Sequence, residues 1–158
     1  MSPSCQDRQA QEELLKYQQI EAIEASNIKI VEQTYKYLDE QILEAWRNLM
    51  STDCKGYLGS SEEPMNFDDL IPMINSFYTA SPDYKHITEA MFAKDDYVVT
   101  RMKYTGTHLR KFMELDSTGN KNEYKGIFIF KLADGKIIEV YGVEDELTMM
   151  TQLGLQLQ

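Results

Sequence analysis

Residues 123–143 read EYKGIFIFKLADGKIIEVYGV and carry the clearest fold signal in the chain. Side chains on either side of Asp134-Gly135 follow a period of two, which is typical of half-buried strands. An Asp-Gly pair favours the positive φ angles of a tight hairpin turn. We therefore predict two antiparallel strands, over residues 123–132 and 137–143, joined by a short hairpin.

The chain outside this hairpin divides into a helical part and a strand part. The expected elements are helices over 28–38, 42–50 and 66–80, a loop over 51–64, and further strands over 84–92 and 97–108. Asn66 would cap the third helix, and Asp145 would cap a short final helix. Helices followed by hairpin-linked strands predict an α+β fold, with a curved antiparallel sheet packed on the N-terminal helices.

The N-terminal segment differs from the rest. Residues 6–27 are rich in Gln, Glu, Ala, Leu and Lys, which are good helix formers, but they carry only a partial apolar stripe. We predict a helical arm or spacer over residues 1–26 and one domain over residues 27–158. A chain of 158 residues suits a single core.

Composition limits the partners and the compartment. A net charge of −10 argues against nucleic acid and anionic membrane surfaces, and no run is apolar enough to span a bilayer. Cys5 and Cys54 form no disulfide framework and have no metal-ligand neighbours. We expect a cytoplasmic protein. The alternative is an extracytoplasmic lipoprotein, because Ser4-Cys5 before a polar helix resembles a lipid-bearing N-terminus whose signal segment has been removed.

Several short motifs occur in a consistent order along the last third of the chain. They are Gly106-Thr107-His108, Ser117-Thr118-Gly119, the hairpin strands, Asp145-Glu146-Leu147 and Gln152-Leu153-Gly154. Together they resemble the SnoaL-like polyketide-cyclase and ester-cyclase family. The resemblance implies a cone-shaped sheet with a pocket for a small apolar molecule, no metal or cofactor, and a homodimer formed through the open sheet face. Ile127, Ile129, Ile137 and Val143 would supply that interface.

Two positions depart from the family. The family's cyclases use a carboxylate on the last strand as acid and base, and the resemblance places Gly142 there. Phe128 stands where the facing strand often carries Asp or His. Alternation would turn Phe128, Phe130, Val140 and Gly142 toward the pocket, so that Phe128 fills the volume that Gly142 leaves.

Other side chains are candidates for the missing chemistry. Glu144 shares the strand face of Gly142 and could reach inward. Tyr57, where relatives often have a histidine, could donate a hydrogen bond to a substrate oxygen or simply pack at the rim. His108 is either an acid at the pocket rim or a strand-end histidine bonded to the backbone. Tyr35, Trp46 and Tyr104 are the remaining expected pocket walls.

Two functions of different class remain open. The first is a cofactor-free enzyme with cyclase- or isomerase-type acid–base chemistry on an apolar carbonyl or polyketide-like compound, using a site different from the family's. The alternative is a non-catalytic ligand-binding or assembly domain that has lost the acid and base. We favour the enzyme; a perturbed carboxylate inside an apolar cavity would support it.

Overall fold

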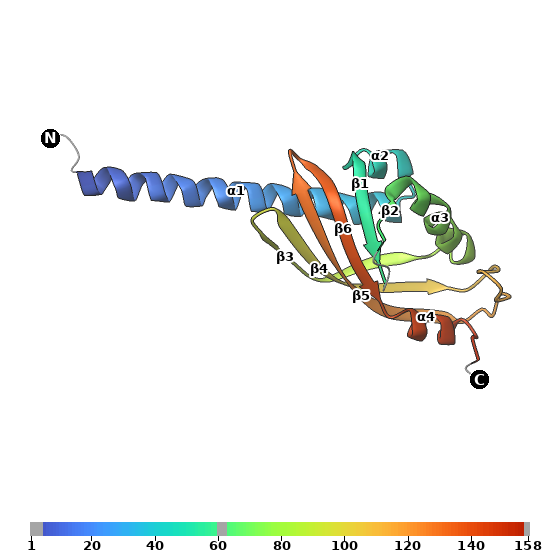
Figure 1. The fold of residues 1–158 in the computed structure, drawn as a ribbon. Coiled ribbons are helices and arrows are strands. Elements are labelled where there is room, and N and C mark those ends of the chain that lie inside the picture. The colour runs from blue at the N-terminus through green and yellow to red at the C-terminus, as the bar shows by residue number, and fades with distance from the viewer. Residues whose placement is uncertain (1–4, 60–62, 157–158) are drawn as a thin grey trace.

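The computed structural model describes residues 5–59 and 63–156. A long helix and a curved sheet dominate it, and three shorter helices and a 3-10 helix complete the described part of the domain (Figure 1). The elements in chain order are α1 (Cys5–Asp39), α2 (Leu43–Arg47), β1 (Met50–Leu58), β2 (Met65–Asn66), η1 (Phe67–Leu70), α3 (Ile71–Ala80), β3 (Lys85–Lys94), β4 (Tyr97–Thr107), β5 (Lys121–Ala133), β6 (Lys136–Glu144) and α4 (Glu146–Gln152).

The six strands form one open, curved sheet in the order β2-β1-β6-β5-β4-β3. The predicted α+β class and the curved sheet are confirmed, but the sheet is mixed because β1 runs parallel to β6. The segment predicted as a loop over 51–64 contains β1. The residues that β1 buries within this segment are Cys54 and Gly56, which are small, so the sequence shows no clear apolar alternation there.

Both sides of the predicted hairpin form as expected, with one change of register. The pairing shifts between Lys131 and Leu132, which places Ile137 opposite Leu132 and buries it fully. Ile137 was therefore wrongly predicted as an exposed interface residue. Ile127, Ile129 and Val143 do lie on the exposed face, at 48%, 37% and 56% exposure.

The helix ends also differ in part from the sequence prediction. Asn66 does not cap a helix with its side chain; its amide oxygen accepts a hydrogen bond from Lys55 Nζ at 2.7 Å. The segment begins as η1 and becomes α-helical only at Ile71. The cap at Asp145 is confirmed, because its carboxylate accepts bonds from the backbone N–H (3.0 Å) and the hydroxyl (2.8 Å) of Thr148.

Helix α1 belongs to the domain only through its C-terminal half. Its buried residues follow helical spacing and face the sheet: Asn27, Val31, Thr34, Tyr35 and Leu38. Residues 7–19 are exposed, and this part of the helix projects away from the sheet (Figure 1). In the part of the chain that the structure describes, no helix has the length and apolarity needed to cross a membrane.

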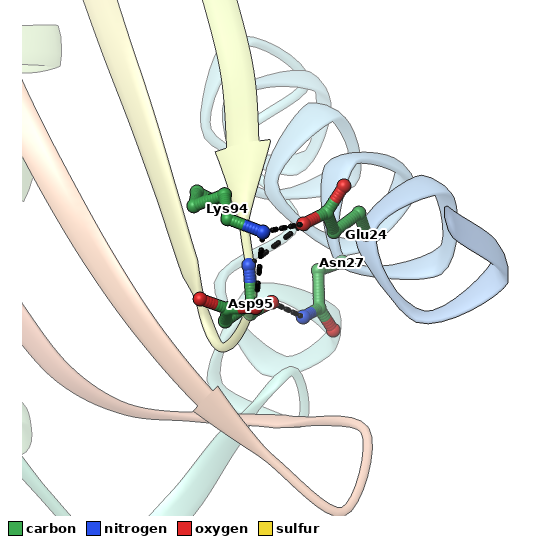
Figure 2. Close-up of polar contacts among 4 residues, drawn as sticks. All are labelled: Glu24, Asn27, Lys94 and Asp95. Carbon is green, nitrogen blue, oxygen red and sulfur yellow. Dashed lines mark hydrogen bonds and ion pairs between the residues drawn. The ribbon is translucent and has the colours of Figure 1, made fainter. Parts of the chain in front are cut away.

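The turn between β3 and β4 fastens α1 where it leaves the sheet (Figure 2). Glu24 Oε1 accepts the backbone N–H of Asp95 at 2.8 Å and lies 3.5 Å from Lys94 Nζ. One helical turn later, Asn27 Nδ2 donates to the Asp95 carbonyl oxygen at 3.4 Å. Asp95 has a positive φ of 52°, so its N–H and C=O are presented to the helix by a tight turn rather than by the strand ladder.

Candidate active site

Two adjoining cavities lie between the inner face of the sheet and α3. The inner cavity is the one that α1 and α2 border, and it has a volume of about 130 Å³. The outer cavity is the one that α4 borders, and it has a volume of about 330 Å³. Both are bounded by Leu58, Met73, Phe77, Phe128 and Glu144. The walls of the inner cavity are mainly apolar, and Glu144 is the one carboxylate among its described lining residues.

Glu144 reaches these cavities because it lies on β6 two residues after Gly142 and so shares its strand face. The side chain is half-buried. Desolvation raises the pKa of its carboxyl to about 7, although a hydrogen bond from Tyr104 acts in the opposite direction. A carboxyl with this pKa is present in both its acid and its carboxylate form near neutral pH, which suits proton transfer.

The space for Glu144 is provided by a glycine on the neighbouring strand. Gly126 pairs with Glu144 across the β5–β6 ladder. A Cβ at position 126 would stand 3.0 Å from Glu144 Cγ and 3.1 Å from Tyr104 Cε2. The absence of a side chain at Gly126 thus lets the glutamate lie over β5 toward the tyrosine.

The tyrosines behind Glu144 form a buried cluster of hydroxyl donors. Tyr104 stacks on Tyr124 with ring centroids 4.9 Å apart, and the hydroxyls of Tyr84 and Tyr124 hydrogen-bond each other. Burial, and then the charge of Glu144, raises the pKa of Tyr104. These phenols therefore stay protonated, and Tyr104 acts as a donor to the carboxylate.

Phe128 stands opposite Gly142 in the ladder and lines both cavities. A Cβ at position 142 would be 2.6 Å from Phe128 Cδ1, so the phenyl ring occupies the space above the glycine. The site thus has an aromatic ring at the position where the resemblance places the family's carboxylate.

The remaining predicted residues divide between the cavities and the surrounding structure. Trp46, Tyr104, Phe130 and Val140 line the inner cavity, and Gly142 lines the outer one. Tyr35 lines neither: its hydroxyl is 2.7 Å from Thr100 Oγ1, and its ring packs edge-on against Phe130.

Tyr57 and His108 lie away from both cavities. Tyr57 stacks on Tyr141 with ring centroids 4.7 Å apart, on the sheet face opposite to Gly142. His108 is fully buried, with Nδ1 3.2 Å from Thr118 Oγ1 and its backbone N–H bonded to Asn120. We do not include either in the candidate site.

Sequence reasoning missed the α3 wall and His86. Met73, Ile74, Phe77 and Tyr78 project from α3 onto the inner cavity. His86 also lines it, with Nδ1 2.7 Å from Asp39 Oδ1. Alternation along β3 does not assign His86 to a face, because a register shift between Thr88 and Ala90 changes the inward residues from even to odd numbers along the strand.

Other site types find no support in the described residues. No three His, Cys, Asp or Glu side chains there gather in a way that could hold a metal ion. Cys54 is buried as a free thiol, and burial raises its pKa to about 11, which leaves it protonated and unreactive.

The comparisons with known proteins agree with this architecture. The family model described as SnoaL-like polyketide cyclase matches residues 28–153. No protein of curated function matches the chain in sequence.

Solved structures of similar fold span most of the chain. AclR from Streptomyces galilaeus, named as a candidate hydroxylase, is 21% identical over 82% of this chain and 96% of its own, with a TM-score of 0.76. A candidate SnoaL-like polyketide cyclase from Jannaschia sp. CCS1 is 21% identical over 85% and 96%, also at 0.76.

A third structure, IdmH from Streptomyces antibioticus, is named as a candidate polyketide cyclase. It is 25% identical over 82% of this chain and 99% of its own, with a TM-score of 0.72. The family model covers well over half of the chain, and the folds agree across nearly the full length of these relatives. The chain belongs to the SnoaL-like polyketide cyclase family.

Proposed function

We propose that the protein is an acid–base enzyme of cyclase or isomerase type that acts on a small apolar carbonyl compound, with Glu144 as a proton-transfer group. The observation that carries this proposal is a carboxyl with a pKa near 7 in a cavity whose other walls are mostly apolar. Perturbed carboxyl groups in such cavities are characteristic of catalytic acids and bases.

The chemistry follows from the position of the carboxyl. A carbon atom next to a carbonyl group releases a proton when a base lies within hydrogen-bond reach. Glu144 would take up or return that proton, while the electron pair moves to the carbonyl oxygen. Tyr104 holds the carboxyl in place. The reaction needs no redox step, which agrees with the expectation of a cofactor-free enzyme.

The inner cavity limits the reacting part of the substrate to about one ring. An apolar cavity of about 150 Å³ is large enough to bind benzene, and the inner cavity has about 130 Å³. The outer cavity adds room for a substituent. The substrate we propose is therefore a compact cyclic carbonyl compound, or one ring of a polyketide-like chain.

The binding-domain alternative keeps one specific observation in its favour. Phe128 covers Gly142, so the position of the family's carboxylate is apolar. If Glu144 served only to bind a ligand, replacing it would change affinity without removing any turnover.

The test measures proton exchange directly. The full chain is incubated in D₂O with a panel of small cyclic ketones, and loss of the hydrogens next to the carbonyl is followed by NMR. Wild type should exchange them, and Glu144→Gln should lower the rate by about 100-fold or more. Glu139→Gln is the matched control, because Glu139 lies on the same strand as Glu144 but lines neither cavity. Equal rates in wild type and Glu144→Gln would reject the proposal.

Three further properties remain proposals. We infer a homodimer through the exposed sheet face, and an arm over residues 1–26 outside a domain over 27–158; the family match beginning at residue 28 supports that boundary. The cytoplasmic location and the lipoprotein alternative also stay predictions. The side chain of Cys5 lies outside the part of the chain that the structure describes.

A further inference from the structure

His86 is held in one orientation by Asp39, the last residue of α1. Asp39 Oδ1 lies 2.7 Å from His86 Nδ1 and also accepts the backbone N–H of His86 at 3.1 Å. The histidine side chain is only 9% exposed. Because the carboxylate meets both the ring and the backbone of the same residue, the imidazole cannot rotate without losing its partner.

This contact sets the chemistry of the other ring nitrogen. A carboxylate at Nδ1 keeps the proton on that atom, so the neutral ring presents Nε2 as a hydrogen-bond acceptor. Within residues 5–59 and 63–156, Nε2 has no hydrogen-bond partner. A histidine with one nitrogen oriented by a carboxylate and the other available to a substrate has the arrangement of a general base.

His86 and Glu144 border the same cavity and share a neighbour. The His86 ring meets Tyr104 edge-on, with centroids 5.3 Å apart, and the hydroxyl of Tyr104 bonds Glu144. The other ionisable groups against the imidazole are Tyr35 of α1 and Tyr84, each with its ring centroid 5.4 Å away. The inner cavity therefore has two proton-transfer groups rather than one.

A third polar group borders this cavity. Tyr78 of α3 is 7% exposed, and its hydroxyl has no hydrogen-bond partner among the described residues. A buried hydroxyl without a partner is unfavourable unless a ligand or water supplies one. The donor that it offers suits a carbonyl oxygen.

We propose that His86, oriented by Asp39, is a second catalytic residue that works with Glu144, and that the Tyr78 hydroxyl binds the substrate's carbonyl oxygen. This inference rests on the proposed function and extends it. Nε2 of His86 takes a proton from the carbon next to the carbonyl, and the electron pair of that C–H bond passes to the oxygen held by Tyr78. Glu144, in its acid form, then delivers a proton to the carbon atom of the resulting enolate, and the electron pair returns from the oxygen to form the new C–H bond. Solvent then removes the proton from His86 and restores the one on Glu144.

The experiment uses the full chain and cyclohexanone, a six-membered cyclic ketone matched to the inner cavity. Exchange of its α-hydrogens in D₂O is measured for wild type, His86→Gln, Asp39→Asn, Tyr78→Phe and Glu144→Gln, with Glu139→Gln as control. His86→Gln should lower kcat by about 100-fold or more. Asp39→Asn should lower kcat by at least about tenfold with little change in KM, and Tyr78→Phe should lower kcat, because negative charge develops on the oxygen that the Tyr78 hydroxyl holds.

A second measurement tests whether Asp39 orients the His86 ring or only stabilises the fold. Long-range ¹H–¹⁵N spectra of the labelled wild type should show neutral His86 as the Nδ1–H tautomer, and Asp39→Asn should increase the Nε2–H form. This measurement decides the orientation even if His86→Gln fails to fold.

The outcomes distinguish the two proposals. Wild-type exchange that Glu144→Gln abolishes but His86→Gln preserves would overturn the role of His86 and leave the proposed function standing. An Nε2–H tautomer in wild type would overturn it as well. Absence of exchange by the wild type, equal to that of Glu144→Gln, would overturn both.

Discussion

The phenyl ring of Phe128 covers Gly142 across the β5–β6 ladder, and a Cβ at position 142 would stand 2.6 Å from Phe128 Cδ1. The two residues are therefore complementary: one has a large side chain because the other has none. A carboxylate at position 142 would require a smaller residue at 128, because the phenyl ring occupies that space.

This pairing predicts a coupled effect on stability. Gly142→Ala alone should lower the free energy of unfolding by about 1–3 kcal/mol, because overpacking forces the ring to move. In the Phe128→Ala background the same change should cost less, with a coupling energy of about 0.5–3 kcal/mol. Urea denaturation of the two single variants and the double variant measures this. Strict additivity would show that the ring and the glycine do not compete for the same space.

The raised pKa of Glu144 predicts a dependence of stability on pH. The folded-state pKa is about 7, above the ordinary value of 4.5, so between these values the folded protein holds more protons than the unfolded chain. The stabilising contribution of this group is complete below pH 4.5, falls as the pH rises toward 7 and is lost above it. We expect a loss on the order of 2 kcal/mol, discounted because the side chain is partly solvated. The difference in unfolding free energy between wild type and Glu144→Gln, measured from pH 4 to 8, isolates it. A difference independent of pH would contradict the prediction.

The close approach of Glu144 to Gly126 predicts that a side chain at position 126 would move the Glu144 carboxyl. A methyl group at 126 would crowd Glu144 Cγ and Tyr104 Cε2. Gly126→Ala should displace the carboxyl toward solvent, return its pKa toward the ordinary value and reduce proton exchange with cyclohexanone by at least about tenfold. NMR titration of labelled glutamate carboxyls gives the pKa. Gly135→Ala has no atoms near its added methyl and serves as a comparison, with strain only from its positive φ. An unchanged pKa in Gly126→Ala would refute the argument.

The exposed apolar face of the sheet predicts a dimer. Ile127 and Val143 are adjacent on β5 and β6 and stand about half exposed to solvent. Such a patch is typical of an interaction surface, and burying it in a second copy removes apolar area from water. Light scattering should give twice the chain mass for wild type and a single chain mass for the Ile127→Lys, Val143→Lys double variant. Leu14→Lys, on the exposed part of α1, should leave the mass unchanged. A monomeric wild type at high micromolar concentration would exclude this interface.

The sequence predicted those parts of the fold in which turn residues and the alternation of large side chains show which face is buried. The hairpin of β5 and β6 was predictable because Asp134-Gly135 fixes the turn and large apolar residues alternate on both sides. Alternation also placed Glu144 on the face of Gly142, and the structure has it at the cavity. The cap formed by Asp145 follows from a short carboxylate directly before a helix.

The features that the sequence did not predict lie in β1, β3 and β6, and each has a physical cause. β1 was missed because the residues that it buries within the predicted loop, Cys54 and Gly56, are small and its pairing depends on a strand far along the chain. Ile137 was misplaced because a register shift in the β5–β6 pairing breaks the period of two, and a similar shift in the β3–β4 pairing keeps alternation from assigning His86 to a face. The pairing of His86 with Asp39 joins residues 47 positions apart, which no local pattern reveals.

The parallel pairing of β1 with β6 has a consequence for how the protein is made. β1 ends at Leu58, and its partner Gly142 follows 84 residues later in the chain; among the described residues, the two-residue β2 is the one strand that β1 can pair with before then. Contacts this distant in sequence form slowly, because a long loop must close first. A nascent chain emerging from the ribosome therefore carries an unmatched strand edge until β6 has been made, and a chain released before residue 136 lacks the strand that covers this edge.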